Sequence, residues 1–227
     1  MKLVLKAAPT LRVDMRGITP AALQGLDVKA VAALTVTHGR EAVALGDLFS
    51  IDAVAAADEL RFEGDLSRFD RVGWQSGEGR IVVDGSVGDY AGAGLRGGAM
   101  HVHGDAGALA ACAMSGGELV IGGSVGDFAA SALPGDMDGM RGGLLVVRGS
   151  AGARFGDRMR RGTALVFGAV GDFAASRMVA GTIALTGGVG AHLGFGMRRG
   201  SVVLLGPAPK IAPTFVPALV EPVVFWQ

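Results

Sequence analysis

The chain has few of the residues on which many protein cores and binding sites depend. Its 227 residues include one cysteine, Cys112, and only 6% of them are aromatic. A single cysteine excludes an internal disulfide. Net charge is also absent, because 21 basic residues balance 21 acidic ones, so the composition gives no electrostatic case for binding nucleic acid. A protein without net charge tends to associate, which suits a subunit that partners cover.

Long apolar runs are missing as well, although half of the residues are hydrophobic. No stretch is both long enough and free enough of glycine and charge to cross a bilayer, and the start MKLVLK lacks the apolar run of a signal peptide. We therefore expect a cytoplasmic protein with no membrane contact. What the chain does contain is glycine, at 39 positions, so its core must depend on the close stacking of small residues.

These glycines form a repeat of the type Gly-x-(Val/Ala)-Gly. Successive units begin 19, 19, 26, 19 and 19 residues apart (for instance 104 − 85 = 19), and one insertion of seven residues (26 − 19 = 7) accounts for the exception. The glycines of the six units are Gly85, Gly88, Gly104, Gly107, Gly123, Gly126, Gly149, Gly152, Gly168, Gly171, Gly187 and Gly190. A second glycine follows each opening one at a fixed distance, once the insertion is allowed for: Gly98, Gly117, Gly143, Gly162, Gly181 and Gly200.

An apolar run of strand length, such as AMHVH, ELVIG or LLVVR, comes after each second glycine. The same alternate positions are apolar in every run, for example Leu119 and Ile121, so the period of two sends them to one interior face. A repeat of 19 residues is too short for the common helical repeats and suits one coil of a parallel β-helix. We therefore predict an all-β fold, a right-handed parallel β-helix whose coils stack about 4.8 Å apart, with a small N-terminal α/β cap.

The repeated glycines are interpreted as structural corners, because a tight coil needs either positive φ or close approach of the backbone, and glycine permits both. A phosphate-binding loop is the alternative. Such a loop precedes a helix, occurs once per domain and, in the P-loop form, carries Gly-Lys-Ser/Thr. Six evenly spaced copies without that lysine favour the structural interpretation.

Three segments are predicted. Residues 1–60 form a cap of strand, helix and hairpin, in which Thr19 caps a helix that has Pro20 at its first position. Residues 61–206 form the β-helix repeats. Residues 207–227 form a proline-rich extended arm, which packs either on a neighbouring subunit or on its own coils.

No catalytic constellation is evident. His101 and His103 lie on one face of a strand, as two metal ligands would, but exposed strand histidines are more often surface residues, and we expect no metal. Cys112 is interpreted as a small buried thiol. Three aspartates at equal positions after the corner are interpreted as corner caps that accept backbone N–H bonds rather than as acids or bases. These aspartates are Asp89, Asp127 and Asp172.

Arginines recur beside the second corner, so a solenoid would gather them along one edge. They are Arg96, Arg141, Arg160 and Arg198, with Arg161 and Arg199 adjacent. One interpretation is that these are solvated turn residues paired with the protein's own acids. The other is contact with carboxylates of a partner or of a cofactor.

The seven-residue insertion lies within residues 131–140, SALPGDMDGM. Insertions in solenoids leave the rod as loops, often at a contact face. We therefore predict a docking loop at Pro134, Asp136, Met137 and Asp138.

From about residue 12 to residue 217 the chain resembles the C subunit of formylmethanofuran dehydrogenase, whose repeat is shared with the C-terminal domain of the glutamate synthase large subunit. The resemblance rests on the serial pattern Gly-x-Val-Gly-x-x-x-(Gly/Ala)-x-x-Met-(Arg)-(Gly/Arg)-Gly, on the insertion before GMRGG, on GDLSRFDRVG at the entry and on APTFVP near the end. The leader from ITPAALQG to GDLFSI resembles one that the dehydrogenase family has and the synthase domain lacks.

The resemblance implies a non-catalytic scaffold subunit in a hetero-oligomer. Its host would be the formyltransferase/hydrolase complex of methylotrophic bacteria, which converts formyl-tetrahydromethanopterin to formate through a methanofuran-type cofactor in one-carbon metabolism. A formyltransferase subunit and an amidohydrolase-like subunit would be the partners, and no cofactor would be bound tightly by this chain. The arginine edge would then meet an acidic partner surface or a polyglutamate-bearing cofactor.

Three other functions are weighed. The chain could be the C subunit of a molybdenum or tungsten formylmethanofuran dehydrogenase, or a freestanding domain of the glutamate synthase type, although the leader argues against the second. An independent β-helix lyase or hydrolase would need carboxylates and bases clustered on neighbouring coils, which the alternation of aspartate and alanine after the corner does not supply.

Overall fold

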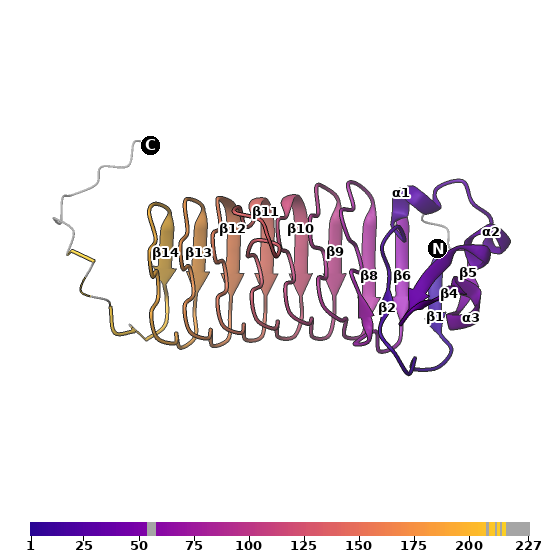
Figure 1. Cartoon of the computed structure of the whole chain (residues 1–227), viewed down its shortest axis with the longest axis horizontal. Coiled ribbons are helices and arrows are strands. Elements are labelled where there is room, and N and C mark those ends of the chain that lie inside the picture. The colour runs from indigo at the N-terminus through magenta and orange to yellow at the C-terminus, as the bar shows by residue number, and fades with distance from the viewer. Residues whose placement is uncertain (54–57, 208, 212, 214, 217–227) are drawn as a thin grey trace.

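The computed structural model describes residues 1–53, 58–207, 209–211, 213 and 215–216. This part of the chain forms an elongated rod of about eight stacked turns (Figure 1). A ten-stranded sheet runs along the rod in the order β14-β13-β12-β11-β10-β9-β8-β6-β1-β5. The predicted β-solenoid with a spacing of about 19 residues is therefore confirmed.

Each coil contributes one strand to this sheet, and strands of successive coils are parallel. These strands are β6 (Glu59–Glu63), β8 (Arg80–Asp84), β9 (Ala99–Val102), β10 (Ser115–Ile121), β11 (Arg141–Val147), β12 (Arg161–Val166), β13 (Thr182–Leu185) and β14 (Ser201–Leu204). The register keeps equivalent residues level, so Met100 pairs with Leu119 and Leu119 with Leu145.

The core is a set of apolar columns along the rod axis. Alternate strand residues such as Leu119, Leu145 and Ile183 are fully buried, and so are the methionines that precede the second corner, for example Met140 and Met159. Aromatic rings are scarce in these columns, as the composition indicates. Leucine, valine, methionine and alanine can fill them because equivalent side chains repeat at every coil and pack at close range.

The two glycines of each coil have different roles. The first does not have positive φ; instead, a Cβ on Gly168 would lie 2.6 Å from the carbonyl carbon and oxygen of Gly149 in the preceding coil. The second combines close approach with a left-handed backbone, as at Gly162, where φ is +91° and a Cβ would lie 2.9 Å from Gly142 C. Close stacking of backbones therefore requires glycine at the first corner. At the second corner, close stacking and the left-handed backbone both require it.

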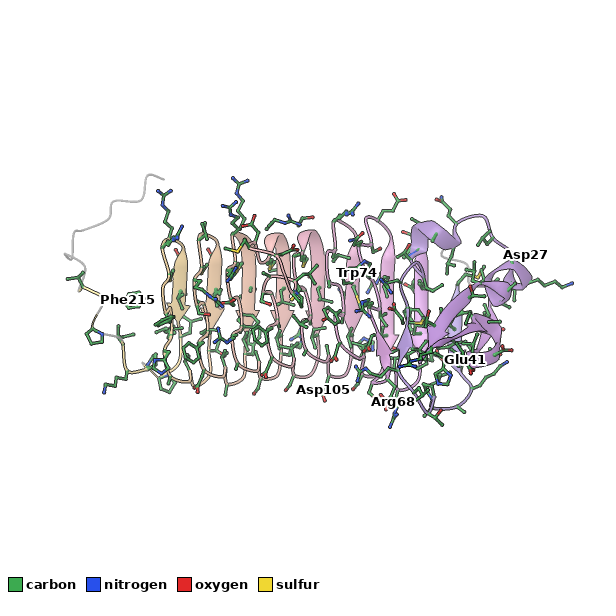
Figure 2. All side chains as sticks on the ribbon, in the orientation of Figure 1. Asp27, Glu41, Arg68, Trp74, Asp105 and Phe215 are labelled. Atoms are coloured by element: carbon green, nitrogen blue, oxygen red, sulfur yellow. The ribbon has the colours of Figure 1, made fainter. Side chains whose placement is uncertain are left out.

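Polar side chains at the first corner join one coil to the next. Asp89 Oδ1 accepts a hydrogen bond from the N–H of Ala108 at 2.9 Å, and Asp127 Oδ1 accepts one from Ala153 at 2.8 Å. Asp172 repeats the contact with the alanine of the following coil. These bonds confirm the prediction of corner caps. Asp105, at the lower edge of the rod in Figure 2, does the same for the N–H of Ser124.

The N-terminal region extends the sheet and covers the first coil. Its elements are β1 (Lys2–Leu5), β2 (Val13–Asp14), α1 (Pro20–Leu23), α2 (Val28–Ala33), β3 (Thr35–His38), β4 (Glu41–Ala44), α3 (Leu45–Leu48), β5 (Phe49–Asp52) and the coil strand β7 (Phe69–Asp70). Strand β1 lies between β6 and β5, while β4, β3, β2 and β7 form a second sheet. Thr19 caps α1 by accepting the N–H of Ala22, as predicted.

At the opposite end, the predicted arm of residues 207–227 lies mostly outside the described residues. Within the described part, Ile211 and Phe215 lie against the last coil and line a cavity of about 240 Å³ with Leu193 and Met197. Figure 2 shows Phe215 beyond β14. Among the described residues, no helix is long and apolar enough to span a bilayer.

Candidate anion-binding groove

The recurring arginines occupy one corner position in successive coils. The backbone N–H of Arg160 donates to Met140 O, and that of Arg198 donates to Met178 O, each at 2.8 Å. Arg141 makes the equivalent bond to Met114 O at 2.6 Å. Because every coil has this bond in the same place, the side chains that follow it emerge along a single edge of the rod.

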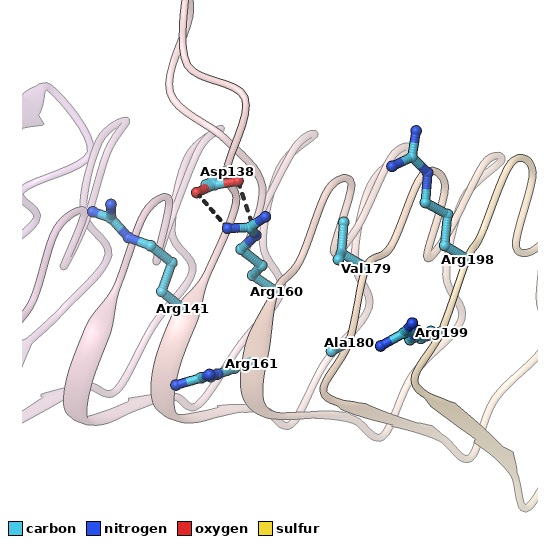
Figure 3. A pocket seen from close by; sticks show the side chains of 8 residues that line it. All are labelled: Asp138, Arg141, Arg160, Arg161, Val179, Ala180, Arg198 and Arg199. Carbon is cyan, nitrogen blue, oxygen red and sulfur yellow. Dashed lines mark hydrogen bonds and ion pairs between the residues drawn. The ribbon is translucent and has the colours of Figure 1, made fainter.

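Five of the arginines surround a groove of about 710 Å³ on this edge (Figure 3). Its lining consists of Asp138, Arg141, Arg160, Arg161, Val179, Ala180, Arg198 and Arg199. The coil between Arg160 and Arg198 has Val179 and Ala180 at the arginine positions. An uncharged floor therefore separates two pairs of guanidinium groups that lie two coils apart, about 9.6 Å along the rod.

The insertion supplies the one carboxylate of the groove. Asp138 lies 3.1 Å from Nε of Arg160, and Arg160 Nη1 also donates to its Oδ2 at 3.3 Å. Five guanidinium groups and one carboxylate give the lining a formal charge of +4 (5 − 1 = 4). Both side chains of this pair remain partly exposed, at 51% and 35%.

The structure places the insertion at residues 132–138. Ser131 still belongs to the coil, because its carbonyl accepts the N–H of Ala113 and its hydroxyl contacts Cys112 Sγ. The loop then projects from the rod, with Met137 73% exposed and its sulfur 2.9 Å from Arg158 Nη1. Pro134 and Asp136 lie on the same loop, and both are exposed. Residues 132–138 fall within the range of 131–140 expected for the insertion.

Arg96 lies outside the groove. It is separated from Arg141 by the coil that has Ser115 at the arginine position, and its Nη2 donates to Gln75 Oε1 at 3.1 Å. Arg96 therefore shares the corner position of the predicted arginine edge, but Ser115 separates it from the groove. What the sequence could not indicate is that Asp138 of the insertion reaches the arginine edge, since the path of the loop depends on the fold.

The remaining candidate residues take part in ordinary structural contacts. His103 Nδ1 lies 2.7 Å from Asp84, and His101 Nδ1 lies 3.3 Å from Arg80 Nη2. No three metal-ligating side chains come together in the parts of the chain that the structure describes. Burial raises the pKa of the Cys112 thiol to about 12, so the thiol is protonated at neutral pH.

The chemistry open to the groove is binding of anions. Guanidinium groups stay charged and present N–H donors in a planar fork that matches a carboxylate. No two groups in the lining form a nucleophile and base, since all its titratable members are arginines except Asp138. The chemistry of this lining suits the binding of a carboxylate ligand.

Comparison with known proteins agrees with the repeat. Residues 65–222 match the model of a family described as GXGXG motif. The C subunit of the formyltransferase/hydrolase complex Fhc of Methylorubrum extorquens is 42% identical over 77 residues, which are 34% of this chain and 29% of that subunit. The C subunit of tungsten-containing formylmethanofuran dehydrogenase 2 from Methanothermobacter wolfeii is 33% identical over 93 residues, 39% of this chain and 34% of the relative. These alignments span about a third of the curated relatives.

A solved structure matches over a greater length. A chain in the crystal structure of the formyltransferase/hydrolase complex FhcABCD from Methylorubrum extorquens, determined in complex with methylofuran, superposes with a TM-score of 0.90 at 42% identity. The match covers 97% of this chain and 83% of that one. The similarity therefore extends over the whole rod, including the cap.

Proposed function

This chain belongs to the GXGXG-motif family and, within it, to the group of C subunits found in formyltransferase/hydrolase complexes and formylmethanofuran dehydrogenases; on that premise we propose that it is the C subunit of a formyltransferase/hydrolase complex. The superposition over 97% of the chain at 42% identity carries the proposal, because it includes the cap as well as the common repeat.

Within such a complex the chain acts as a scaffold that holds a formyltransferase subunit and an amidohydrolase-like subunit. The reaction of the complex converts formyl-tetrahydromethanopterin to formate through a methanofuran-type cofactor, in the cytoplasm. Two features support a structural role for this chain. The corner aspartates are engaged in hydrogen bonds between coils, and the one buried aspartate of the described residues, Asp157, is paired with Arg177 and Ser176.

The insertion is the proposed docking loop. It leaves the rod at residues 132–138, and Met137 offers a large apolar side chain that is 73% exposed. We expect Met137→Glu to lower the recovery of a partner subunit, because a charge would be buried at the contact. Leu11→Glu, at an apolar side chain 55% exposed on the cap, is the matched control. Equal recovery with both variants contradicts the docking role.

The host complex is tested by purifying the tagged chain from its native cell. We expect a formyltransferase subunit and an amidohydrolase-like subunit to travel with it, together with a methanofuran-type cofactor. Recovery of a molybdopterin or tungstopterin subunit instead supports the second candidate, a formylmethanofuran dehydrogenase. The 33% identity to the C subunit of the tungsten enzyme favours this candidate to a lesser degree. Formyl transfer or hydrolysis by the isolated polypeptide overturns the scaffold role.

A further inference from the structure

The interior columns of the rod lose their cover at the last coil. In earlier coils the inward-facing side chains are fully buried, as Leu185 and Met178 are. Their equivalents in the last coil, Leu204 and Met197, pack against the core but are only half-buried. Each column therefore finishes with a side chain over which another apolar layer can pack.

Strand β14 also has a free backbone edge. Among the described residues it pairs with β13 alone. The N–H groups of Ser201 and Leu205 donate to carbonyls of the preceding coil at 2.9 and 2.8 Å. Backbone groups alternate in direction along a strand, so those of Val202 and Leu204 point away from β13. Such an edge can pair with a further strand, and solenoids normally cover it.

The other end of the rod shows how this chain closes an edge. Strands β1 and β5 extend the sheet beyond β6. Phe49 of β5 is buried there, with its ring centroid 5.9 Å from that of Phe62 and 5.3 Å from that of Phe69. Added strands and an aromatic ring thus complete the first coil.

A cavity of about 240 Å³ remains at the β14 end, and its lining consists of apolar side chains and glycines, among them Val202 and Leu204. An apolar cavity of about 150 Å³ already holds a benzene molecule, so this one admits an aromatic ring. Ile211 and Phe215 lie at the cavity but do not close it, because they remain 47% and 44% exposed.

The outer face of β14 is apolar as well. Val203 is 41% exposed and Leu205 is 69% exposed. In β9 and the residue after it, the equivalent positions are His101 and His103. The free edge of β14 therefore has apolar side chains on both faces, which suits a strand that is itself apolar on both faces.

The residues that follow Val216 have that composition. Residues 217–227 read PALVEPVVFWQ, with Glu221 as the one charged residue. Residues 223–226 are two valines, a phenylalanine and a tryptophan, which favour strands, and Pro222 suits the start of an edge strand. The eight residues from Phe215 to Val223 span up to about 26 Å, which is enough to reach any part of β14 from the cavity.

We propose that residues 217–227 cover the last coil, with residues 223–226 paired along β14 and the rings of Phe225 and Trp226 on its two faces, one of them in the cavity. The segment is tethered at Phe215, so its effective concentration at the edge exceeds that of a separate chain. The covered edge is closed to end-to-end association of copies. This contact lies within one chain and does not depend on the proposed function.

Tryptophan fluorescence tests the cover. Trp74→Phe leaves Trp226 as the single tryptophan and keeps a ring beside Arg71 and Tyr90. In the folded full-length chain, acrylamide should quench Trp226 about fivefold more weakly than in the urea-unfolded chain, because the ring is buried against β14. Equal quenching in the folded and unfolded chain overturns the proposal.

A charge in the cavity should release the cover. In the Trp74→Phe background, Val202→Asp should raise the quenching of Trp226 towards its unfolded value, because an apolar segment does not pack on a carboxylate. Val146→Asp is the control, since Val146 is also a half-buried strand valine and lies outside this cavity. Equal changes in the two variants would mean general loosening of the rod and would refute the contact.

Hydrogen exchange tests the pairing with β14. Phe225→Asp with Trp226→Asp should speed exchange in residues 201–205 about fivefold, the equivalent of one lost backbone hydrogen bond. Val216→Asp places a charge on the same arm, at a side chain that is 88% exposed and outside the cavity lining, and should change exchange less than about twofold. Unchanged exchange in the double variant contradicts the added strand.

The occupant is identified by light scattering alongside the quenching measurement. Protection of Trp226 in the monomer, at every concentration, assigns the cover to the chain's own segment. Protection that is lost when a dimer dissociates assigns the edge to a second copy, and protection found only in the complex purified through this chain assigns it to a partner subunit. Either of these two results overturns the proposal and leaves the proposed function untouched.

Discussion

Replacing the first-corner glycine by alanine tests the stacking of the coils. In Gly168→Ala the new methyl group would lie 2.6 Å from the carbonyl carbon of Gly149 and 2.6 Å from Ser150 Oγ. Ordinary contacts between such atoms are about 3.5–4.0 Å, so the coils must separate by close to 1 Å at this corner. The hydrogen bond from the Gly168 N–H to Gly149 O, now 2.8 Å, would lengthen with them.

The expected loss of stability follows from these contacts. Overpacking costs about 1–3 kcal/mol and the weakened hydrogen bond about 1 kcal/mol. The lower entropy of the unfolded alanine chain offsets about 0.4–1 kcal/mol of this. We therefore expect Gly168→Ala to lower the free energy of unfolding by about 1–4 kcal/mol, which is a melting temperature lower by about 2–14 °C for a chain of this size.

Gly188→Ala is the matched control in the following coil. Gly188 is exposed, its φ is not in the left-handed region, and nothing lies within 4 Å of a Cβ built there. Its melting temperature should equal that of the unaltered protein or exceed it slightly, as measured by circular dichroism and by urea unfolding. Equal stability of the two variants would refute the argument that close backbone approach selects glycine at the first corner.

Two further predictions concern buried groups. Asp157 is 4% exposed, and Arg177→Met removes the guanidinium that lies 2.7 Å from its carboxylate, so this variant should lower the free energy of unfolding in urea by about 2–3 kcal/mol. Adding Asp157→Asn should recover part of that loss. No recovery would contradict the pairing. At pH 8.5, Cys112 in the folded protein should react with iodoacetamide about a thousandfold more slowly than the same thiol in the unfolded chain. Burial raises the pKa of this thiol to about 12, so little of it is thiolate. Equal rates in the folded and unfolded protein would refute the burial of Cys112. Since the folded pKa lies above the ordinary value of 9.0, the contribution of this thiol to stability is complete below about pH 9 and is lost as the pH rises towards 12.

The coiled architecture could be predicted because it depends on the period of the glycines and on the alternation of strand residues. Residues such as Leu119 and Leu145 occupy the same phase of every repeat and lie level in the sheet. The start of the first cap helix could also be predicted at Thr19 and Pro20, where local capping chemistry depends on neighbours in sequence. Both signals are short in range, so the sequence alone contains them.

The backbone at the corners could be predicted only in part. Positive φ was one of the two causes expected for glycine at the first corner. In the structure, left-handed φ near this corner instead falls on the residue after the aspartate, or after the alanine that replaces it in alternate coils. These residues include Phe128, Arg154 and Phe173. These residues carry a conformational cost that glycine would avoid. Hydrogen bonds between coils fix them there, such as Phe128 N–H to Ala153 O, and Arg154 lies 4.9 Å from the Phe173 ring.

The groove could not be predicted from the sequence for a different reason. Counting along the repeat aligns the arginines and also places Ser115 and Val179 at the arginine position, but that Val179 lines a groove appears only when the coils are stacked. The approach of Asp138 to Arg160 depends on how a seven-residue loop returns to the rod, which no periodicity specifies. The repeat therefore predicts the coils, whereas the groove forms where the insertion and Val179 depart from the repeat.

The account depends on a rigid solenoid that holds other subunits and performs no chemistry itself. An electron cryomicroscopy structure of the complex purified through this chain tests that claim most directly. We expect the coils unchanged, residues 132–138 buried against a partner, and every catalytic centre built from the partners' residues. A catalytic centre lined by side chains of this chain, or a rod whose corner glycines are no longer stacked, would contradict it.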